Sequence, residues 1–284
     1  ERCRIVVRRP NVTLIGFEVR DTEEHAVEFV GSPGGVVDRC TFRDNRLDGA
    51  FFFRQDGGRA ENCVAARNGR HGIWFLGTQN GVAVSNTLSG NGASGIAVGN
   101  SPGVILFNNL LAHNGVGLRL TGEGTETVRS DHNLLVGGVI GHRSDATWQE
   151  ANAGTLEDWQ ELSGQDPHSL KGDPLLRDPG NGDFQPSAPP TGVWSPAVAA
   201  GLWAAEFAGQ KAPASDMLGR NRSPAVQSAV GALYAESSGP GSPFATVAMP
   251  FDGRLSLGVF DVSGQMVREL LRDYPARKGK RDLY

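Results

Sequence analysis

The sequence predicts an all-β fold in which short parallel strands coil into a solenoid, and three observations support this prediction. The chain has 39 glycines in 284 residues, roughly twice the usual ~7%, which indicates many tight turns. A pattern of residues repeats every 23 positions through the first half of the chain. Within each repeat, apolar and polar residues alternate in runs too short for a helix, as they do in strands with one buried face.

The repeat consists of columns of equivalent residues. Four asparagines are spaced 23 residues apart and a glycine takes the next step: Asn45, Asn68, Asn91, Asn114 and Gly137. A second polar column runs five residues ahead: Cys40, Cys63, Asn86, Asn109 and His132. An apolar column lies between them: Phe42, Ala65, Leu88, Leu111 and Leu134. A glycine column follows, with one residue deleted before its last member: Gly49, Gly72, Gly95 and Gly117.

A unit of 23 residues suits one coil of three strands and three corners, and the columns extend over five to six coils. Stacked coils place equivalent residues ~4.8 Å apart, so each buried asparagine amide is expected to hydrogen-bond to the next. The general rule for parallel crossovers predicts a right-handed path. We therefore expect the solenoid to occupy residues 1–141.

Two of the copies, AVSNTLSGNGASGIAVGNSPG and ILFNNLLAHNGVGLRLTGEG, resemble the right-handed parallel β-helix repeats of the pectate-lyase-like superfamily. The resemblance covers residues 5–141 and implies a right-handed parallel β-helix. That superfamily includes lyases, hydrolases, epimerases and non-catalytic adhesins. The resemblance therefore implies the fold more specifically than the chemistry.

A mixed C-terminal cap is expected over residues 142–235, where the repeat has ended. Thr155 and Asp158 have the spacing of a capping box, which predicts a helix over residues 155–163 that ends at Gly164. We expect residues 145–234 to pack on the last coil, because the end of a solenoid exposes apolar surface. Four large apolar side chains in this segment also need cover: Trp148, Trp159, Trp194 and Trp203.

The last part of the chain predicts a linker and a hairpin. Residues 236–250 are rich in Gly, Ser and Pro, as linkers are. Residues 251–284 contain an alternating apolar run, a turn at Ser263 and Gly264, and a second strand. This pattern resembles the opening hairpin of the immunoglobulin-like domain of the flagellar hook-assembly type. The resemblance implies a truncated β-sandwich on a secreted or cell-surface protein, and we interpret the chain as a fragment open at both ends.

Charge and hydropathy exclude several classes of protein. A net charge of −4, from 27 Lys and Arg against 31 Asp and Glu, provides no basic surface for nucleic acid. The longest apolar stretch, residues 197–205, is too short to span a membrane. Cys40 and Cys63 would stack inside the solenoid as buried thiols, with a disulfide between them as the open alternative. We expect a monomer.

The candidate site is a strip of side chains that point outward from neighbouring coils. His25, Asp48 and His71 lie in register and are the candidate catalytic residues, because a stacked His–Asp–His group can transfer protons. Asp48 between them is expected to keep both imidazoles cationic. The candidate substrate-binding residues offer aromatic faces for sugar rings and charges for an acidic sugar: Glu28, Arg46, Phe51, Arg70, Trp74 and Arg119. The alternative is a polar corner with solvent-facing aromatic residues.

No protein metal site is predicted, and Ca²⁺ is the one candidate cofactor. Two pairs of carboxylates share columns: Asp21 with Asp44, and Asp38 with Glu61. Each pair would need further ligands for Ca²⁺, and Asp38 with Glu61 also meets the ~5–9.5 Å separation of a glycosidase pair. The segment DPGNGDF, with Asp178 and Asp183, lacks the complete ligand spacing of a calcium loop and indicates a turn.

Two functions remain open from the sequence. The first is a secreted carbohydrate-active β-helix, with uronate polysaccharide lyase or glycoside hydrolase as its enzymatic forms. The second is a non-catalytic extracellular adhesion or glycan-binding module. The clustered His, Arg and aromatic residues favour the first, whereas the dispersed acidic residues and the short array favour the second. In either case the expected partner is a polysaccharide or a cell-surface glycan.

Overall fold

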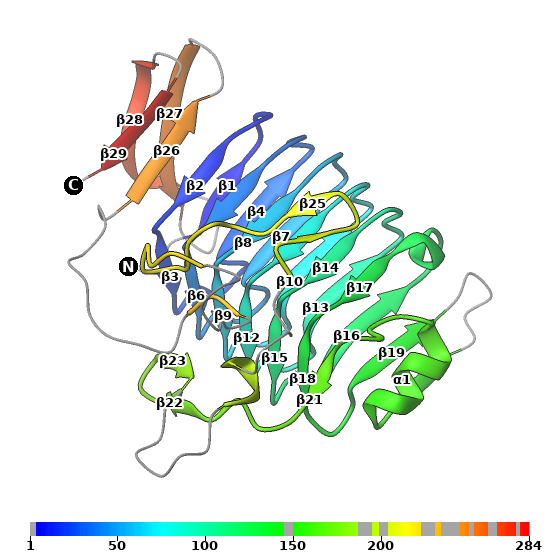
Figure 1. Cartoon of the computed structure of the whole chain (residues 1–284). Coiled ribbons are helices and arrows are strands. Elements are labelled where there is room, and N and C mark those ends of the chain that lie inside the picture. Colours follow the sequence, from blue (N-terminus) through cyan, green and yellow to red (C-terminus); the bar gives the residue numbers. More distant parts are fainter. Residues whose placement is uncertain are drawn as a thin grey trace.

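The structure is a computed structural model in which a stack of parallel coils forms the main body (Figure 1). It describes residues 4–144, 150–186, 195–198, 204–222, 231–233, 245–249, 253–260, 266–276 and 279–283. Three of the tryptophans expected to pack on the last coil, Trp148, Trp194 and Trp203, lie outside these residues. Trp159 lies within them.

Three sheets run the length of the stack, each with one strand from every coil. The first sheet consists of β1 (Ile5–Val7), β4 (Val27–Val30), β7 (Ala50–Phe53), β10 (His71–Leu76), β13 (Ser94–Gly99), β16 (Val116–Thr121) and β19 (Gly141–Ser144), with β20 (Glu150–Ala153) antiparallel at its end. The second sheet contains β2 (Thr13–Ile15), β5 (Val36–Asp38), β8 (Arg59–Glu61), β11 (Val82–Val84), β14 (Ile105–Phe107) and β17 (Arg129–Asp131). The third sheet contains β3 (Glu18–Arg20), β6 (Thr41–Arg43), β9 (Val64–Ala66), β12 (Thr87–Ser89), β15 (Leu110–Ala112), β18 (Leu134–Val136) and β21 (Leu170–Lys171).

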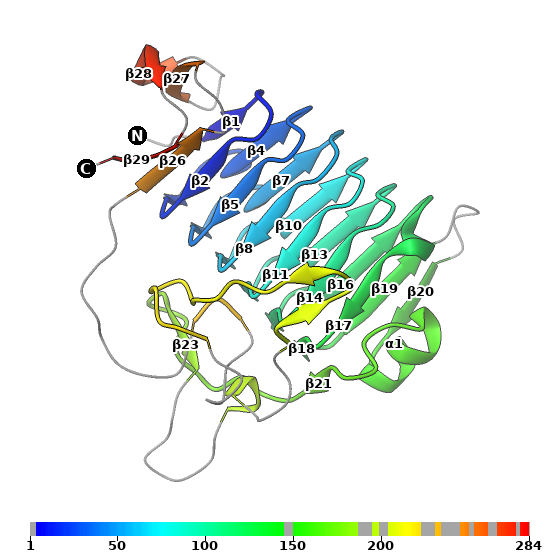
Figure 2. The same cartoon turned by 45° about the horizontal axis from the view of Figure 1, so that its top comes forward.

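Within each sheet, strands of successive coils pair in parallel, as Figure 2 shows. Ile73 is in register with Ile96, and Ile96 with Leu118, which confirms the predicted columns and the single deletion before Gly117. Aromatic side chains of the core follow the same register. The rings of Phe29 and Phe52 stack with centroids 5.0 Å apart, and Phe52 stacks on Phe75 at the same distance. The predicted all-β parallel solenoid is confirmed.

The asparagine column forms the expected ladder inside the solenoid. The Nδ2 atoms of Asn45, Asn68 and Asn91 each donate to the Oδ1 of the next asparagine, at 2.8, 2.9 and 2.9 Å. Each accepting Oδ1 also accepts the backbone N–H of the asparagine one coil earlier. Each of the three Nδ2 atoms also donates to a backbone carbonyl. The buried amides are thus fully hydrogen-bonded, as burial requires.

A second ladder corrects the predicted place of His132. Asn86 donates to Asn109 at 3.0 Å, but the next member is Asn133, which accepts from Asn109 at 3.2 Å. His132 occupies the corner before it, with φ of 57°. The apolar column likewise continues from Leu111 to Leu135 rather than to Leu134. The reason is one extra residue in this coil, which contains the short 3₁₀ helix Thr125–Thr127.

The two interior cysteines are free thiols, so the disulfide alternative is wrong for this structure. Cys40 Sγ donates to the Asp38 carbonyl at 3.3 Å, and Cys63 Sγ donates to the Glu61 carbonyl at 3.2 Å. Burial is the main cause that raises the pKa of the Cys63 thiol well above its usual value. Both cysteines therefore act as small apolar core residues.

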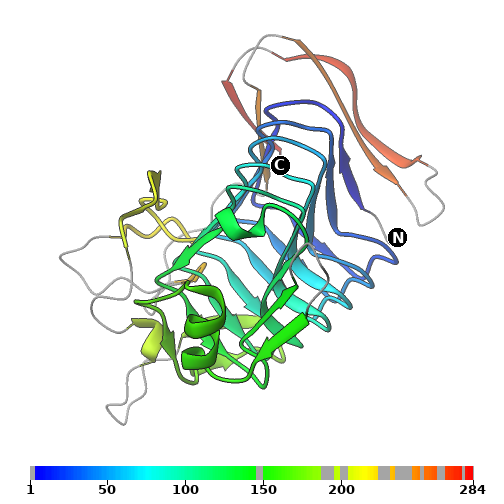
Figure 3. The same cartoon turned by 90° about the vertical axis from the view of Figure 1, so that its right-hand side faces the viewer.

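The predicted helix is confirmed as α1 (Leu156–Ser163), which lies at the end of the stack (Figure 3). The Thr155 side chain accepts the Asp158 N–H, Asp158 accepts the Thr155 N–H in return, and Gly164 ends the helix with φ of 68°. Trp159 is buried in the solenoid core, where its indole N–H donates to Asp166 at 2.9 Å. No helix among the described residues has the length and hydropathy of a membrane-spanning segment.

The segment after α1 packs along the side of the solenoid rather than only on the last coil. Phe184 and Leu233 cover Val64 and Ala66 on the outer face of the third sheet. Further apolar side chains of the segment pack against Val82, Val84 and Phe107 on the second sheet. Two short hairpins belong to this segment: β22 (Leu176–Asp178) with β23 (Asp183–Pro186), and β24 (Glu206–Phe207) with β25 (Gln210–Lys211). The expected cap thus has two parts. Residues 150–171 form an end cover on the last coil, and the described residues of 176–233 form a side cover along the second and third sheets.

The last part of the chain contains the predicted hairpin, formed by β27 (Gly253–Phe260) and β28 (Met266–Ala276). Its expected turn at Ser263 and Gly264 lies outside the described residues. Within the expected linker, β26 (Ala245–Met249) forms a strand that pairs antiparallel with β2 and with β29 (Gly279–Leu283). The strands extend the second sheet at its first coil, and the immunoglobulin-like domain stays a prediction.

We expect Asn68→Ala to lower the free energy of unfolding by about 2–4 kcal/mol, because it leaves buried partners on both neighbouring coils without a hydrogen bond. Chemical denaturation monitored by circular dichroism measures this loss. The control is Asn181→Ala in an exposed turn, which should cost less than about 1 kcal/mol. Equal losses for the two variants would contradict the ladder's role.

Gly72→Ala should destabilise the protein by about 1–3 kcal/mol. A Cβ at Gly72 would lie 2.7 Å from Leu88 Cδ2 and 2.8 Å from the Gly95 carbonyl oxygen, so the coils would have to move apart. Gly154→Ala is the matched control, because nothing lies within 4 Å of the position that its Cβ would occupy. Thermal unfolding compares the stability of the two variants. If Gly72→Ala did not lower the unfolding temperature, the coils would be able to move apart at this position without cost.

Candidate functional site

The outer face of the first sheet has the predicted register of side chains. Glu28 is opposite Phe51, Phe51 opposite Trp74, and the line continues through Ala97 to Arg119. We call these five residues the outer strip. One coil further, Arg119 is opposite His142, whose Nδ1 lies 2.8 Å from Asn152 Oδ1. The sequence signal for His142 was its position 23 residues after Arg119, and it was missed.

Beside the outer strip lies the predicted polar stack, formed by His25, Asp48, His71 and Ser94. His25 Nδ1 is 2.8 Å from Asp48 Oδ2, and the other oxygen of Asp48 accepts the backbone N–H of His71 at 2.8 Å. His71 Nδ1 is 2.6 Å from Ser94 Oγ. The structure therefore brings the three candidate catalytic residues together on successive coils.

The polar stack is buried, contrary to the expectation of an exposed strip. His25 is 9% exposed, His71 is 6% exposed and Asp48 is fully buried. The aromatic side chains of the outer strip provide this cover, since Phe51 lies against His25 and Trp74 lies against His71. Substitutions in the polar stack should therefore lower the stability of the protein, whereas substitutions at exposed positions would not.

His71 is not the cation that the sequence suggested. Burial is the main cause that lowers the pKa of its imidazole, to about 4, and the positive charges of Arg70 and Arg119 add to this effect. Asp48 opposes the shift without cancelling it. The ring is therefore neutral at neutral pH, with Nδ1 engaged by Ser94 and no hydrogen bond to Nε2 from any described residue.

The two aromatic residues of the outer strip differ in what they can contact. Phe51 is only 6% exposed, because its ring stacks on Trp74 with centroids 4.6 Å apart and contacts His25 at the same distance. Trp74 is half-buried, and the Arg70 guanidinium lies 4.6 Å from its ring centroid in a cation–π contact. Of these two aromatic residues, Trp74 is therefore the one that reaches the surface, together with Arg70.

Two guanidinium groups on this face have no carboxylate partner among the described residues, namely those of Arg70 and Arg119. Arg119 Nε is also buried without a hydrogen bond, and this burial lowers the pKa of Arg119. On the other two sheets, by contrast, Arg59 lies 2.7 Å from Glu61 and Arg67 lies 2.7 Å from Asp44. Arg129 on β17 of the second sheet also has no carboxylate partner among the described residues, but it is exposed, whereas Arg70 and Arg119 are half-buried.

The remaining predicted binding residues lie apart from Trp74 or are already paired. Glu28 is half-buried on β4, 4.0 Å from Arg4 Nη1. Arg46 is at a corner, where its side chain is 72% exposed and 3.7 Å from Glu23. It lines a shallow recess of about 250 Å³ with neighbours that include Asp44. Arg46 therefore does not contribute to the Trp74 surface in this structure.

Arginines occupy the acidic pairs that were considered for Ca²⁺ or hydrolysis. Arg67 binds both oxygens of Asp44, at 2.7 and 2.9 Å, and this contact is the main cause that lowers the pKa of Asp44. Asp38 and Glu61 are each paired with an arginine of their own coil, at 3.1 and 2.7 Å. These contacts leave the carboxylates poorly placed to bind a cation.

The segment with Asp178 and Asp183 forms the turn of the hairpin of β22 and β23, as the sequence indicated. Asp178 accepts two hydrogen bonds from Asn181, at 2.7 Å from Nδ2 and 3.3 Å from the backbone N–H. Asp183 accepts the Gln185 N–H at 3.0 Å. The carboxylates shape the turn.

We expect His71 to titrate with a midpoint of about 4, well below the ordinary ~6.5 of histidine. The unfolded state then binds the proton first as the pH falls, so stability should be complete above ~6.5 and decrease toward pH 4, by up to about 1.4 kcal/mol per pH unit. His71→Gln should remove this part of the pH dependence, and exposed His113→Gln should not. NMR of the histidine rings gives the midpoint, and one near 6.5 would refute it.

The comparisons with known proteins agree with this architecture. Residues 2–135 match a family model described as right handed beta helix region. No curated protein and no solved structure gave a significant match to the chain. The matched residues include the strands β1 to β17 of the three sheets and both asparagine ladders. Through these residues the chain is a right-handed parallel β-helix repeat protein.

Proposed function

We propose that the outer face of the first sheet binds an acidic polysaccharide, and that the protein is an extracellular carbohydrate-active β-helix. The observation that supports this proposal most directly is the pair of guanidinium groups of Arg70 and Arg119, which have no carboxylate partner among the described residues. Guanidinium groups bind carboxylates through two parallel hydrogen bonds, so the carboxylates of uronate sugars are suitable ligands for these arginines. A ligand carboxylate would supply the kind of partner that Glu61 gives Arg59 and Asp44 gives Arg67.

The spacing of the sheet suits an extended ligand. Arg119 on β16 is in register with Trp74 on β10, two coil steps or roughly 10 Å along the stack. Arg70 directly precedes β10, and its guanidinium reaches the Trp74 ring, so a ligand over Trp74 could approach both arginines. The strand between them contributes the small residues Ala97 and Gly99. Trp74 Nε1 lies 3.8 Å from where a Cβ of Gly99 would be. Trp74 therefore leans over this strand, where a sugar could contact its edge.

A second candidate function is β-elimination at the same surface, which the neutral state of His71 favours. In such a reaction Nε2 of His71 would take the proton beside the uronate carboxylate, and the electron pair would form a carbon–carbon double bond as the glycosidic oxygen leaves. Arg70 and Arg119 would stabilise the charge that develops on the carboxylate. The low pKa of His71, about 4, makes it a weak base, so binding alone is the stronger proposal.

We expect Arg70→Ala and Arg119→Ala each to weaken binding of uronate oligosaccharides about tenfold, since each variant removes one charge-assisted contact. Isothermal titration calorimetry with acidic and neutral oligosaccharides of equal length measures the effect. Arg129→Ala is the matched control, because Arg129 is exposed on β17 of the second sheet. Equal binding of neutral and acidic ligands, or none of either, would refute the proposal.

The same samples distinguish binding from elimination. An eliminating enzyme produces unsaturated sugar ends, whose ultraviolet absorbance grows with time, and His71→Gln should abolish this signal while affinity persists. If the parent protein binds uronates and no absorbance develops, the elimination candidate is wrong and the binding proposal stands.

A further inference from the structure

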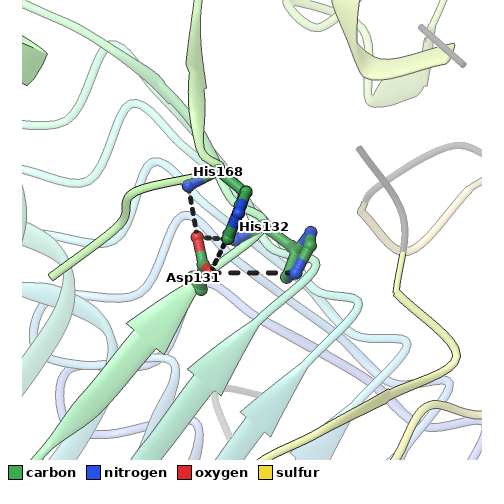
Figure 4. A group of neighbouring side chains, drawn as sticks. All are labelled: Asp131, His132 and His168. Carbon is green, nitrogen blue, oxygen red and sulfur yellow. Dashed lines mark hydrogen bonds and ion pairs between the residues drawn. The ribbon is translucent and has the colours of Figure 1, made fainter. Parts of the chain in front are cut away.

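A cluster of metal-ligating side chains lies at the last coil of the solenoid, and neither proposed function uses it. Asp131 ends β17, His132 is the next corner residue, and His168 follows α1 in the end cover (Figure 4). One potential ligand atom from each of the three lies within 4.8 Å of the others. The cluster thus joins the last coil of the solenoid to its cover.

Asp131 is held in an orientation that directs one oxygen at the two histidines. Its Oδ1 accepts the backbone N–H groups of His132 and His168, at 2.9 and 2.8 Å. Its Oδ2 lies 2.7 Å from His168 Nδ1 and 3.7 Å from His132 Nε2. Backbone hydrogen bonds that orient a carboxylate in this way are typical of the surroundings of metal ligands.

The two imidazoles are also positioned from several sides. Their rings stack with centroids 5.3 Å apart and planes 12° apart, and His132 further contacts Phe207 edge-on, with ring centroids 6.0 Å apart. The His132 corner has φ of 57°, which turns it out of the interior ladder that Asn133 continues. Asp131 is buried whereas the His168 side chain is 69% exposed, so the group opens to solvent on one side.

We propose that Asp131 Oδ2, His132 Nε2 and His168 Nδ1 bind a divalent transition-metal ion of the Zn²⁺ type. Two imidazole nitrogens and one carboxylate oxygen are the donor set that Zn²⁺ takes in three-ligand sites, with water in the fourth position. Ligand atoms in such a tetrahedron lie roughly 3–3.5 Å apart, given bonds of ~2.0–2.2 Å. Small movements of the exposed His168 ring from its present hydrogen bond would reach this geometry.

Binding there would stabilise the end of the solenoid. His168 belongs to the cover, whereas Asp131 and His132 belong to the last coil, so one ion would hold the two together. The competing interpretation is a metal-free staple, in which Asp131 fixes the cover through hydrogen bonds alone. The two interpretations differ in whether His132 matters, because the staple depends on Asp131 and His168.

The test uses the chain without a polyhistidine tag, freed of metal by a chelator that is then removed. Zn²⁺ is titrated by calorimetry, and Co²⁺ is added separately to look for visible absorption bands of a tetrahedral site. His132→Gln is the informative variant, since it leaves the bond between Asp131 and His168 in place. His113→Gln is the control, because His113 is exposed at a corner with φ of 56°, close to the 57° of His132.

We expect one Zn²⁺ per chain with micromolar or tighter affinity, a higher midpoint of thermal unfolding with the ion, and at least tenfold weaker binding for His132→Gln and for His168→Gln. His113→Gln should bind as the parent does, and metal-free His132→Gln should unfold within a few degrees of the metal-free parent. No stoichiometric binding, or unchanged affinity in His132→Gln, would overturn the proposal and leave the metal-free staple.

Discussion

The hydrogen-bonded asparagine ladder is the constraint on which the rest of the β-helix depends. Each amide bonds to the amide and backbone of the neighbouring coil, as from Asn45 to Asn68 at 2.8 Å, so a shift by one residue would leave buried polar groups unpaired. Apolar burial drives the chain to collapse but tolerates sliding, whereas this directional bonding does not. Register then places every outward side chain, including the unpaired guanidiniums, above its equivalent one coil away.

The ladders also determine how the solenoid ends. Asn133 closes the second ladder by donating to Asp166 at 2.9 Å, and Asp166 accepts the Trp159 indole N–H and the Ser169 hydroxyl. Asp166 is fully buried, which raises the pKa of its carboxyl while these hydrogen bonds act in the opposite direction. Polar and apolar contacts of the cover therefore meet at Asp166, beside the buried Trp159. A solenoid without such a cover would expose both its core and its last ladder bonds.

The 23-residue period alone predicted most of the fold. When coils stack in parallel, residues that recur at this interval must lie above one another in the stack. It failed at His132, since a single residue inserted in a corner changes which side chain enters the interior and cannot be located by counting. For the candidate site, alternation predicted which side chains point outward but not which of them meet solvent. Phe51 and Trp74 cover the polar stack because large side chains on adjacent strands contact each other, and this depends on rotamers rather than on spacing.

The three outer faces of the solenoid are covered differently, and among the described residues the first sheet is the face where half-buried arginines, Arg70 and Arg119, have no carboxylate partner. On the third sheet, Phe184 and Leu233 of the side cover bury apolar side chains. On the second sheet, arginines such as Arg59 are matched with carboxylates of the same face. Among the described residues, the cover reaches the first sheet only at its end, through β20 and α1. Among the described residues, neither Arg70 nor Arg119 has a carboxylate within ion-pair distance on this face. Burial lowers the pKa of Arg119, and the charge of Glu150 offsets this only in part. Charges that folding does not neutralise favour an anionic ligand, and this is the physical basis of the proposal that the first sheet binds one.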